Sequence, residues 1–239
     1  MGIKYSVNSG FFNKWTAQMS YTLGFIYADG AIYKSSRGNY LAITSIDKDV
    51  LNMIKGWMDS KHNIYKTTFK DKNRKTKYLL RIGNKEMFYS LLNIGVSPNK
   101  SLTMVVPNIP KKFLPDFVRG YFDGDGCVYL ERAKGLKKNK IVKRLSIIFT
   151  SGSREFLKKL LIVLQREAKI KQTKIYNSHR SYQIRLSTQD ALKVFGYMYS
   201  GAQKEYFLER KFKIFKKYFN LRPQRVDGMV KSILEFHKQ

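Results

Sequence analysis

The sequence has too few cysteines and histidines for a disulfide or a zinc site. Its 239 residues include one cysteine, Cys127, and three histidines. A single cysteine excludes an internal disulfide and any cysteine-built zinc centre. The histidines, His62, His179 and His237, are scattered and lack the spacing of metal ligands. We therefore expect neither a disulfide-stabilised scaffold nor a zinc centre.

Acidic residues are also scarce. The chain contains 17 Asp and Glu against 46 Lys and Arg, which gives a formal net charge of +29. At 43% hydrophobic and 14% aromatic residues, it is too apolar for a disordered basic tail. A folded protein this basic needs a polyanionic partner, or tolerates strong repulsion among its own positive charges without one. Nucleic acid is the first choice and a membrane surface the second.

Long apolar runs are absent as well. No stretch reaches the length of a membrane span, and no secretory signal opens the chain. We therefore expect an intracellular, non-secreted protein that does not enter a membrane. Richness in Lys, Ile, Asn and Tyr suggests an AT-rich genome, which leaves an organellar, bacterial or phage host open.

An internal repeat is the most informative feature of the chain. Residues 24–30 (GFIYADG) align with residues 120–126 (GYFDGDG), 96 positions later. Three further matches follow at offsets of 104 to 106, which are Thr44 with Thr150, Arg81 with Arg185, and Lys100 with Lys204. The offset grows because the second copy carries a long basic loop, residues 131–144, where the first has only residues 34–39. Two tandem copies of one unit explain these offsets.

Each copy is predicted to contain a helix, two strands, a helix, two strands and a helix. The opening helices cover residues 14–28 and 113–124, where apolar residues recur at helical spacing. Side chains alternate along the strands, so that Leu145, Ile147 and Phe149 face the core while Arg144, Ser146, Ile148 and Thr150 face outward. These patterns predict an α+β fold with two tandem αββαββα repeats and two antiparallel sheets. The predicted organisation is a first repeat at 14–104, a linker at 105–112, a second repeat at 113–218 and a C-terminal tail at 219–239.

An aspartate stands at the end of each opening helix, directly before a glycine. Glycine just past a helix is the usual left-handed stop, so Asp29 and Asp125 lie where helix-end carbonyls make a carboxylate unfavourable. Small residues at 24, 28, 120 and 124 permit the two helices to pack side by side about a pseudo-twofold axis. The two carboxylates would then meet in an oxygen-rich site suited to Mg²⁺. Paired metals of this kind serve phosphodiester hydrolysis.

The segments LGFIYADG (23–30) and VRGYFDGDG (118–126) resemble the two copies of the LAGLIDADG motif. The chain as a whole resembles a single-chain, two-repeat LAGLIDADG homing endonuclease over about residues 14–218. The resemblance implies that the motif helices form the interface between repeats and that the two sheets form a DNA-binding saddle. It also implies cleavage of both strands of a long recognition site in duplex DNA by a monomer.

The resemblance assigns roles to individual positions. It makes Asp29 and Asp125 the metal-binding acids, with the carbonyls of Ala28 and Gly124 as additional ligands. The expected cofactor is Mg²⁺, with Mn²⁺ able to substitute and Ca²⁺ supporting binding without fast cleavage. Lys100 and Lys204 match the basic residue that the family places before the last helix of each repeat, near the scissile phosphates. Tyr27 departs from the motif, since the second copy keeps an acid there, Asp123, and we expect asymmetry at the helix interface.

The outward-facing strand residues and turns are predicted to contact DNA. In the first copy these are Tyr33, Ser35, Arg37, Tyr40, Thr44, Lys66, Thr68, Lys70, Arg74, Lys77 and Arg81. In the second copy they are Tyr129, Glu131, Lys138, Lys140, Arg144, Ser146, Ile148, Lys174, Tyr176, Arg180, Gln183 and Arg185.

Two other functions remain open at this point. Members of the LAGLIDADG family, which the chain resembles, can assist splicing of their host intron. An RNA-binding intron maturase is therefore the chief alternative. A catalytically inactive DNA-binding regulator of the same fold is another, although acids retained in both copies favour cleavage. An intein-embedded origin is not expected, because the chain lacks flanking splicing blocks and opens with Met1.

Overall fold

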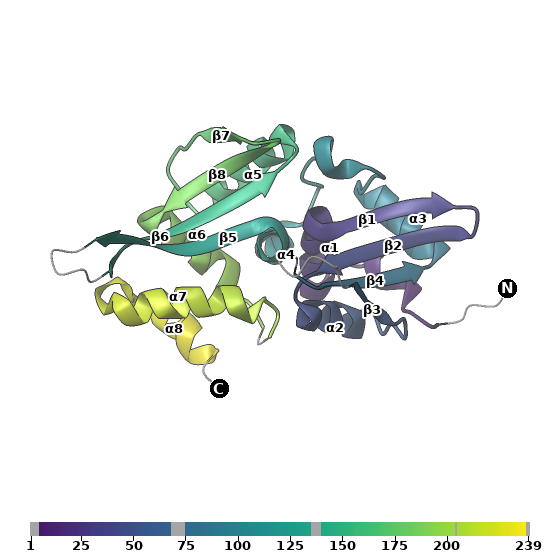
Figure 1. Ribbon diagram of the computed structural model, residues 1–239, viewed down its shortest axis with the longest axis horizontal. Coiled ribbons are helices and arrows are strands. Elements are labelled where there is room, and N and C mark those ends of the chain that lie inside the picture. The colour runs from purple at the N-terminus through teal and green to yellow at the C-terminus, as the bar shows by residue number, and fades with distance from the viewer. Residues whose placement is uncertain (1–4, 68–74, 135–139, 204, 238–239) are drawn as a thin grey trace. The chain divides into compact units, whose positions relative to one another are not determined.

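A computed structural model describes residues 5–67, 75–134, 140–203 and 205–237 of the chain (Figure 1). The chain divides into two compact units, Met1–Gly124 and Asp125–Gln239. Within the described residues, no helix is long and apolar enough to cross a membrane.

The first unit contains one four-stranded antiparallel sheet with helices on one face. After a 3-10 turn, η1 (Ser9–Phe12), the elements follow in the predicted order, with two short 3-10 turns added around the linker. They are α1 (Ala17–Asp29), β1 (Gly30–Ser35), β2 (Gly38–Ser45), α2 (Lys48–Trp57), β3 (Ile64–Thr67), β4 (Lys77–Gly83), α3 (Lys85–Ile94), η2 (Lys100–Leu102), η3 (Lys111–Phe113) and α4 (Leu114–Asp125). The strand order is β1-β2-β4-β3.

Side-chain caps fix where the helices of this unit begin. The Thr16 hydroxyl accepts from the backbone N–H of Met19 at the start of α1, and Asn84 accepts from Met87 at the start of α3. Such caps satisfy N–H groups that have no partner inside the helix. The core of the unit lies between the sheet and its helices and includes Leu41, Ile43, Leu80, Ile82, Leu51, Ile54, Phe88 and Leu91, all essentially inaccessible to solvent.

The second unit repeats the sheet and adds helices at its end. Its elements are β5 (Gly126–Lys134), β6 (Lys140–Ser151), α5 (Arg154–Glu167), β7 (Ile175–Ser178), β8 (Ser181–Ser187), α6 (Thr188–Tyr199), α7 (Glu209–Leu221), η4 (Pro223–Arg225) and α8 (Gly228–Phe236). The strand order, β5-β6-β8-β7, reproduces that of the first sheet. The predicted α+β, two-repeat architecture is therefore confirmed.

Helix α7 belongs to the core of the second unit. Phe212, Phe215 and Phe219 on α7 pack their rings against Phe195 of α6, with centroid distances of 6.1, 4.8 and 5.1 Å. The aromatic side chains of α7 are therefore core residues. The predicted C-terminal tail contains the helix α8, which packs against α6.

The two opening helices, α1 and α4, are in direct contact within the first unit. A Cβ atom at Gly24 would overlap the carbonyl oxygen of Phe117, and one at Gly120 would overlap the carbonyl of Tyr21. The glycines are therefore required for the backbones to approach this closely, as predicted. Because α4 packs on α1, all of α4 except its last residue lies in the first compact unit, Met1–Gly124.

A β-bulge interrupts the long hairpin of the second unit. The register pairs Glu131 with Arg144 but Arg132 with Val142, so β6 has one extra residue at this point. The bulge inverts the side-chain alternation beyond it, and Val142 is consequently buried although it is even-numbered like Arg144. Lys140, predicted to face outward from the uninterrupted alternation, pairs with Lys134 beyond the bulge. Its side chain lies outside the part of the structure that is described.

Candidate metal and nucleic-acid site

Both candidate metal-binding aspartates end an opening helix. Asp29 is the last residue of α1 and Asp125 the last of α4, and each is followed at once by the strand that starts its sheet. The Asp29 side chain is half-buried and that of Asp125 is exposed. On the first unit's side, a Cβ atom at Gly124 would lie 3.5 Å from Oδ2 of Asp29. The missing side chain thus leaves space beside this carboxylate.

The glycines after the two aspartates do not have the left-handed conformation that we expected. Gly30 has φ −107° and ψ 159°, which is extended backbone open to any residue. Its requirement for glycine is steric instead, because a Cβ atom there would lie 2.7 Å from Cα of Ile26. Among the described glycines, only Gly38 and Gly95 have positive φ angles, so Gly126 is not a left-handed stop either.

The donor set around the helix ends fits a hard divalent cation. The first unit supplies the carboxylate of Asp29 and the carbonyls of Ala28 and Gly124, and the second unit supplies the carboxylate of Asp125, all of them oxygens. Within the described residues, no group of three or more His, Cys, Asp or Glu side chains could hold a metal alone. Mg²⁺ typically binds through one or two carboxylates and completes its shell with waters and substrate phosphates. The oxygen donors at each helix end are thus of the type that Mg²⁺ binds in combination with waters and phosphate oxygens.

Lys100 brings a buried positive charge to the end of α1. It is 5% exposed, and its Nζ donates a 3.0 Å hydrogen bond to the carbonyl oxygen of Tyr27. Carbonyls in the last turn of a helix lack intrahelical partners, and a cation there is favourable. The sequence placed Lys100 before the last helix of its repeat, but it lies after α3, in η2.

A second buried lysine, Lys211, lies beside Asp125 and was not predicted. Lys211 is on α7, is 3% exposed, and donates from Nζ to the carbonyl oxygen of Gly126. Lys204, which was predicted, lies outside the described residues. The sequence did contain an indication that Lys211 is buried. The lysine lies on the apolar side of α7, next to Phe212 and four residues before Phe215. A charged residue in such a position is rarely buried without a specific partner.

The motif position that differs between the copies produces two different contacts at the helix interface. Tyr27 of α1 is buried and packs edge-on against Phe117 of α4, with ring centroids 5.4 Å apart. Burial raises the pKa of the Tyr27 hydroxyl above its usual value. Asp123, the corresponding residue of α4, accepts a 2.7 Å hydrogen bond from the Tyr21 hydroxyl. The asymmetry expected here is therefore present.

The first sheet has an outer face formed by the strand residues that point away from the helices. The register places Tyr33 opposite Tyr40, Ala42 opposite Arg81, and Thr44 opposite Leu79 on this face. The Tyr33 and Tyr40 rings stack at 5.3 Å, and the Arg81 guanidinium lies 5.9 Å from the Tyr40 ring. The predicted residues Ser35, Arg37, Thr44, Lys77 and Arg81 are exposed.

Strand β3 corrects one assignment on the first sheet. Lys66 pairs with Tyr78, and Tyr78 is on the same face as the core residue Leu80. Lys66 is therefore on the core side of the sheet, although its side chain is exposed to solvent. Its neighbours Tyr65 and Thr67 are on the outer face instead, since they pair with Leu79 and Lys77. The dipeptide Ile-Tyr recurs in β7 as residues 175–176, so the match of Tyr65 with Tyr176 could have been found in the sequence.

The second sheet has an equivalent outer face, and most of its residues were predicted. Its described members are Cys127, Tyr129 and Glu131 on β5, Arg144, Ser146, Ile148 and Thr150 on β6, Gln183, Arg185 and Ser187 on β8, and Tyr176 and Ser178 on β7. Arg185 lies 5.2 Å from the Tyr176 ring and donates from Nε to Gln183 Oε1 at 3.0 Å. Ser146 is buried and donates to Glu131. Lys174 and Arg180 are exposed beside β7.

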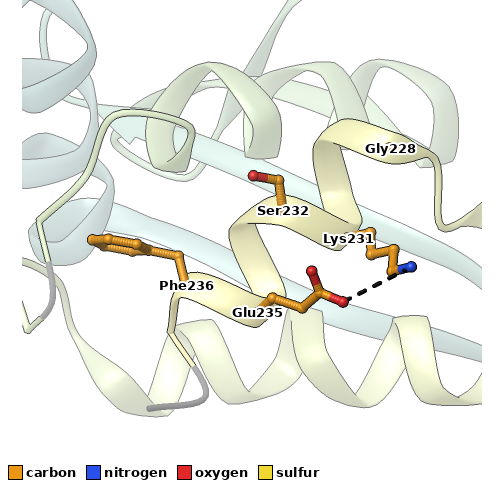
Figure 2. A pocket seen from close by; sticks show the side chains of 5 residues that line it. All are labelled: Gly228, Lys231, Ser232, Glu235 and Phe236. Carbon is orange, nitrogen blue, oxygen red and sulfur yellow. Dashed lines mark ion pairs between the residues drawn. The ribbon is translucent and has the colours of Figure 1, made fainter.

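Four predicted contacts lie outside the described residues, namely Thr68, Lys70, Arg74 and Lys138. Elsewhere, Lys231, Ser232, Glu235 and Phe236 line a shallow surface pocket on α8 together with Gly228 (Figure 2). The Lys231 and Glu235 side chains form a 3.9 Å ion pair there. An exposed i,i+4 ion pair of this kind contributes little, and the pocket offers no arrangement for catalysis.

The repeated αββαββα unit, with an aspartate at the end of each opening helix, defines a two-repeat protein of the LAGLIDADG type. The chain belongs to this family. The model of the family described as the LAGLIDADG-like domain matches residues 17–94 and again residues 113–197, together more than half of the chain.

Solved structures of the same fold include nucleases bound to DNA. The homing endonuclease I-WcaI, bound to its DNA recognition sequence, is similar with a TM-score of 0.58 and 16% identity, over 85% of this chain and 90% of that one. The meganuclease I-AabMI, bound to uncleaved DNA, has a TM-score of 0.57 and 12% identity, over 93% and 96%. The N-terminal LAGLIDADG domain of WhiA has a TM-score of 0.52 and 15% identity, over 87% and 93%. At these identities the likeness establishes the fold.

Curated relatives match only through a segment. The chain is 28% identical over 147 residues to the DNA-directed RNA polymerase subunit Rpo1C of Methanocaldococcus jannaschii. It is 28% identical over 177 residues to the probable translation initiation factor IF-2 of the same organism. The matches span 15% and 13% of those proteins, so the activities in their names do not describe this chain.

Proposed function

We propose that this protein is a site-specific double-strand DNA endonuclease that hydrolyses a phosphodiester in each strand of a long recognition site. The observation that carries the proposal is the duplicated helix end. Asp29 and Asp125 each end an opening helix, and a buried lysine binds a carbonyl within two residues of each. DNA-bound nucleases among the structural neighbours support the same substrate.

The two aspartates would hold divalent metal, Mg²⁺ by preference and Mn²⁺ as a substitute. When bound, such an ion supplies an activated water and neutralises charge that develops on the phosphate oxygens. The carboxylates themselves would bind the ion. We expect Ca²⁺ to support DNA binding with little cleavage, because its coordination is looser than the octahedral geometry of Mg²⁺.

The buried lysines would hold the ends of the motif helices and place positive charge near the cleaved phosphates. Preorganised cations of this kind stabilise negative charge that develops during phosphoryl transfer. We assign this role to Lys100 and Lys211. Lys204, which lies outside the described residues, is a further candidate.

The outer faces of the two sheets would bind the duplex. They combine arginine, lysine and polar side chains with exposed tyrosines, and the protein carries a net charge of +29. Positive residues contact phosphates, whereas side chains directed at base edges read the sequence. The host intron RNA remains an alternative partner that no described contact favours.

A cleavage selection tests the proposal directly. The protein is incubated with a randomised duplex library in Mg²⁺, in Ca²⁺, and in Mg²⁺ as the Asp125→Asn variant, and the cut ends are sequenced. We expect ends enriched for one long motif, from the unaltered protein in Mg²⁺ only. Bound but uncut DNA would instead identify a DNA-binding member of this fold that does not cleave. Failure to bind DNA would make structured RNA the next ligand to test.

A further inference from the structure

The outer face of the second sheet carries one acid among basic and polar side chains. Of the described residues on this face, Glu131 is the only carboxylate, while Arg144 lies on the adjacent strand β6 and Arg185 on the next strand, β8. A carboxylate on a surface that approaches DNA repels phosphates and weakens binding. Its presence therefore needs another explanation, and its surroundings supply one.

Glu131 is held in place by a buried hydroxyl. The Ser146 Oγ donates a 2.8 Å hydrogen bond to Oε1 of Glu131, and Ser146 is only 4% exposed. Glu131 itself is half-buried, so part of the side chain still reaches solvent. The carboxylate is thus fixed on the face and accessible to a ligand.

The backbone next to Glu131 is fixed as well. The bulge begins directly after Glu131, where Arg132 pairs with Val142. The carbonyl of Val142 accepts a 2.6 Å hydrogen bond from Nη2 of Arg222, just beyond α7. Bulges direct a particular side chain away from the regular sheet surface. Here the hydrogen bond from Arg222 fixes the backbone of the bulge.

The chemistry of a fixed carboxylate selects what it can bind on DNA. An ionised carboxylate accepts hydrogen bonds and cannot donate them. The donors exposed in the major groove are the exocyclic amino groups, N4 of cytosine and N6 of adenine. Arg144 stands directly opposite Glu131 in the ladder, and arginine preferentially binds O6 and N7 of guanine.

We propose that Glu131 determines specificity by accepting a hydrogen bond from an exocyclic base amino group, N4 of cytosine, while Arg144 binds the guanine paired with it. Glu131 and Arg144 would then together read a single C·G base pair of the recognition site. This inference rests on the proposed function, because it requires a duplex on the outer face of the second sheet.

A binding selection without divalent metal separates the two proposals. The unaltered protein and its Glu131→Gln variant are each selected against a randomised duplex library, and the preferences are compared position by position. Glutamine keeps the size of the side chain but can both donate and accept. We expect a cytosine preference of roughly 5- to 150-fold at one position to be lost in the variant, with the other positions unchanged.

Matched variants locate the effect. Ser146→Ala should weaken the preference at the same position, because it removes the hydrogen bond that holds the carboxylate. Arg81→Gln, on the outer face of the first sheet, should alter a different position. A duplex whose cytosine lacks the N4 amino group should bind the unaltered protein at least about fivefold more weakly, and should bind Glu131→Gln without this loss.

Each outcome has a defined meaning. If the unaltered protein enriches no duplex motif, the proposed function fails. If a motif is found but Glu131→Gln leaves every position within twofold, or raises affinity equally for all sequences, the specificity role of Glu131 is overturned. If Glu131→Gln loses a preference for adenine rather than cytosine, Glu131 does recognise a base amino group, but the assignment to a C·G pair is overturned.

Discussion

At the scale of single residues, the two motif aspartates make the sharpest prediction. Asp29→Asn and Asp125→Asn keep the size of each side chain and remove the charge that would bind metal. We expect either variant to lose double-strand cleavage, while its DNA affinity stays within about an order of magnitude, because phosphate contacts dominate binding. Cleavage and binding assays on the same duplex check this. Normal cutting by either variant would contradict the metal assignment.

Lys211 carries a second prediction. Lys211→Met preserves most of the side-chain volume but removes the ammonium that binds the Gly126 carbonyl. We expect cleavage to fall at least about tenfold, since the removal of one preorganised charge-stabilising donor typically costs that much or more. Loss of this part-buried hydrogen bond should also lower the unfolding free energy, by about 0.5 to 1.5 kcal/mol.

The control for Lys211 lies on the same helix. Lys213 is exposed and forms only a 3.9 Å ion pair with Glu209, so Lys213→Met should leave both cleavage and melting nearly unchanged. If the two variants cleave equally well, Lys211 has no part in the site.

At the scale of secondary-structure elements, the contact between α1 and α4 depends on two glycines. Gly120→Ala would place a methyl group on the carbonyl of Tyr21, which the neighbouring backbone cannot avoid without moving. We expect an unfolding free energy lower by about 1 to 3 kcal/mol, as for other overpacked interiors. Chemical denaturation measures it.

Substitution of Gly56 in α2 is expected to have the opposite effect on stability. A Cβ atom there would meet nothing within 4 Å, so Gly56→Ala should raise stability by up to about 1 kcal/mol through helix propensity alone. Equal destabilisation by both substitutions would mean that the helix contact is not the cause.

The loop between α2 and β3 contributes a pH dependence. The pKa of His62 lies below its usual value of 6.5, because burial and then the nearby Lys55 both disfavour the imidazolium. The unfolded chain therefore takes up a proton at higher pH than the folded protein does. Stability should be unaffected well above pH 6.5 and should fall as the pH drops below it.

The comparison with His62→Gln isolates this effect. The unfolding free energy of the unaltered protein should fall more steeply than that of the variant from pH 6.5 to about 5. Identical slopes for His62→Gln and the unaltered protein would show that His62 titrates alike in both states.

Much at this scale follows from local sequence patterns. The matched motif glycines indicated close helix packing, and strict alternation assigned the faces of β4 and β8, because one buried face enforces a period of two. The alternation is read within a single strand, and the glycines were noticed because the two copies of the motif match each other.

The features that the sequence did not reveal depend on contacts between distant segments. The bulge after Glu131 reverses the alternation on β6, and nothing in the run of residues marks where the extra residue falls. Lys211 contacts Gly126, 85 residues earlier, so only the packing of α7 on β5 brings them together. The face of β3 was misassigned at Lys66 because a four-residue strand gives little alternation to read.

At the scale of the whole molecule, the charge of +29 predicts how binding responds to salt. Each phosphate that the protein neutralises releases bound counterions, so affinity should fall steeply as salt rises. With about 6 to 10 phosphate contacts, the loss between 50 and 200 mM salt is about 10³- to 10⁵-fold. Titrations of a fixed duplex at several salt concentrations measure this slope, and a shallow slope would exclude the basic sheet faces as the DNA surface.

The place of α4 matters for anyone who wishes to recombine this protein with a relative. By sequence α4 opens the second copy, but by packing it belongs to the first unit, where its Gly120 lies against the backbone of Tyr21 in α1. A hybrid joined within residues 105–112 would give α1 a foreign partner helix across a contact that admits no extra methyl group. A joint after Gly126 would move the second sheet with its outer face and leave the matched pair of helices intact. Exchange of repeats between two-repeat LAGLIDADG proteins should therefore succeed more often when the joint follows the helix pair than when it lies in the linker.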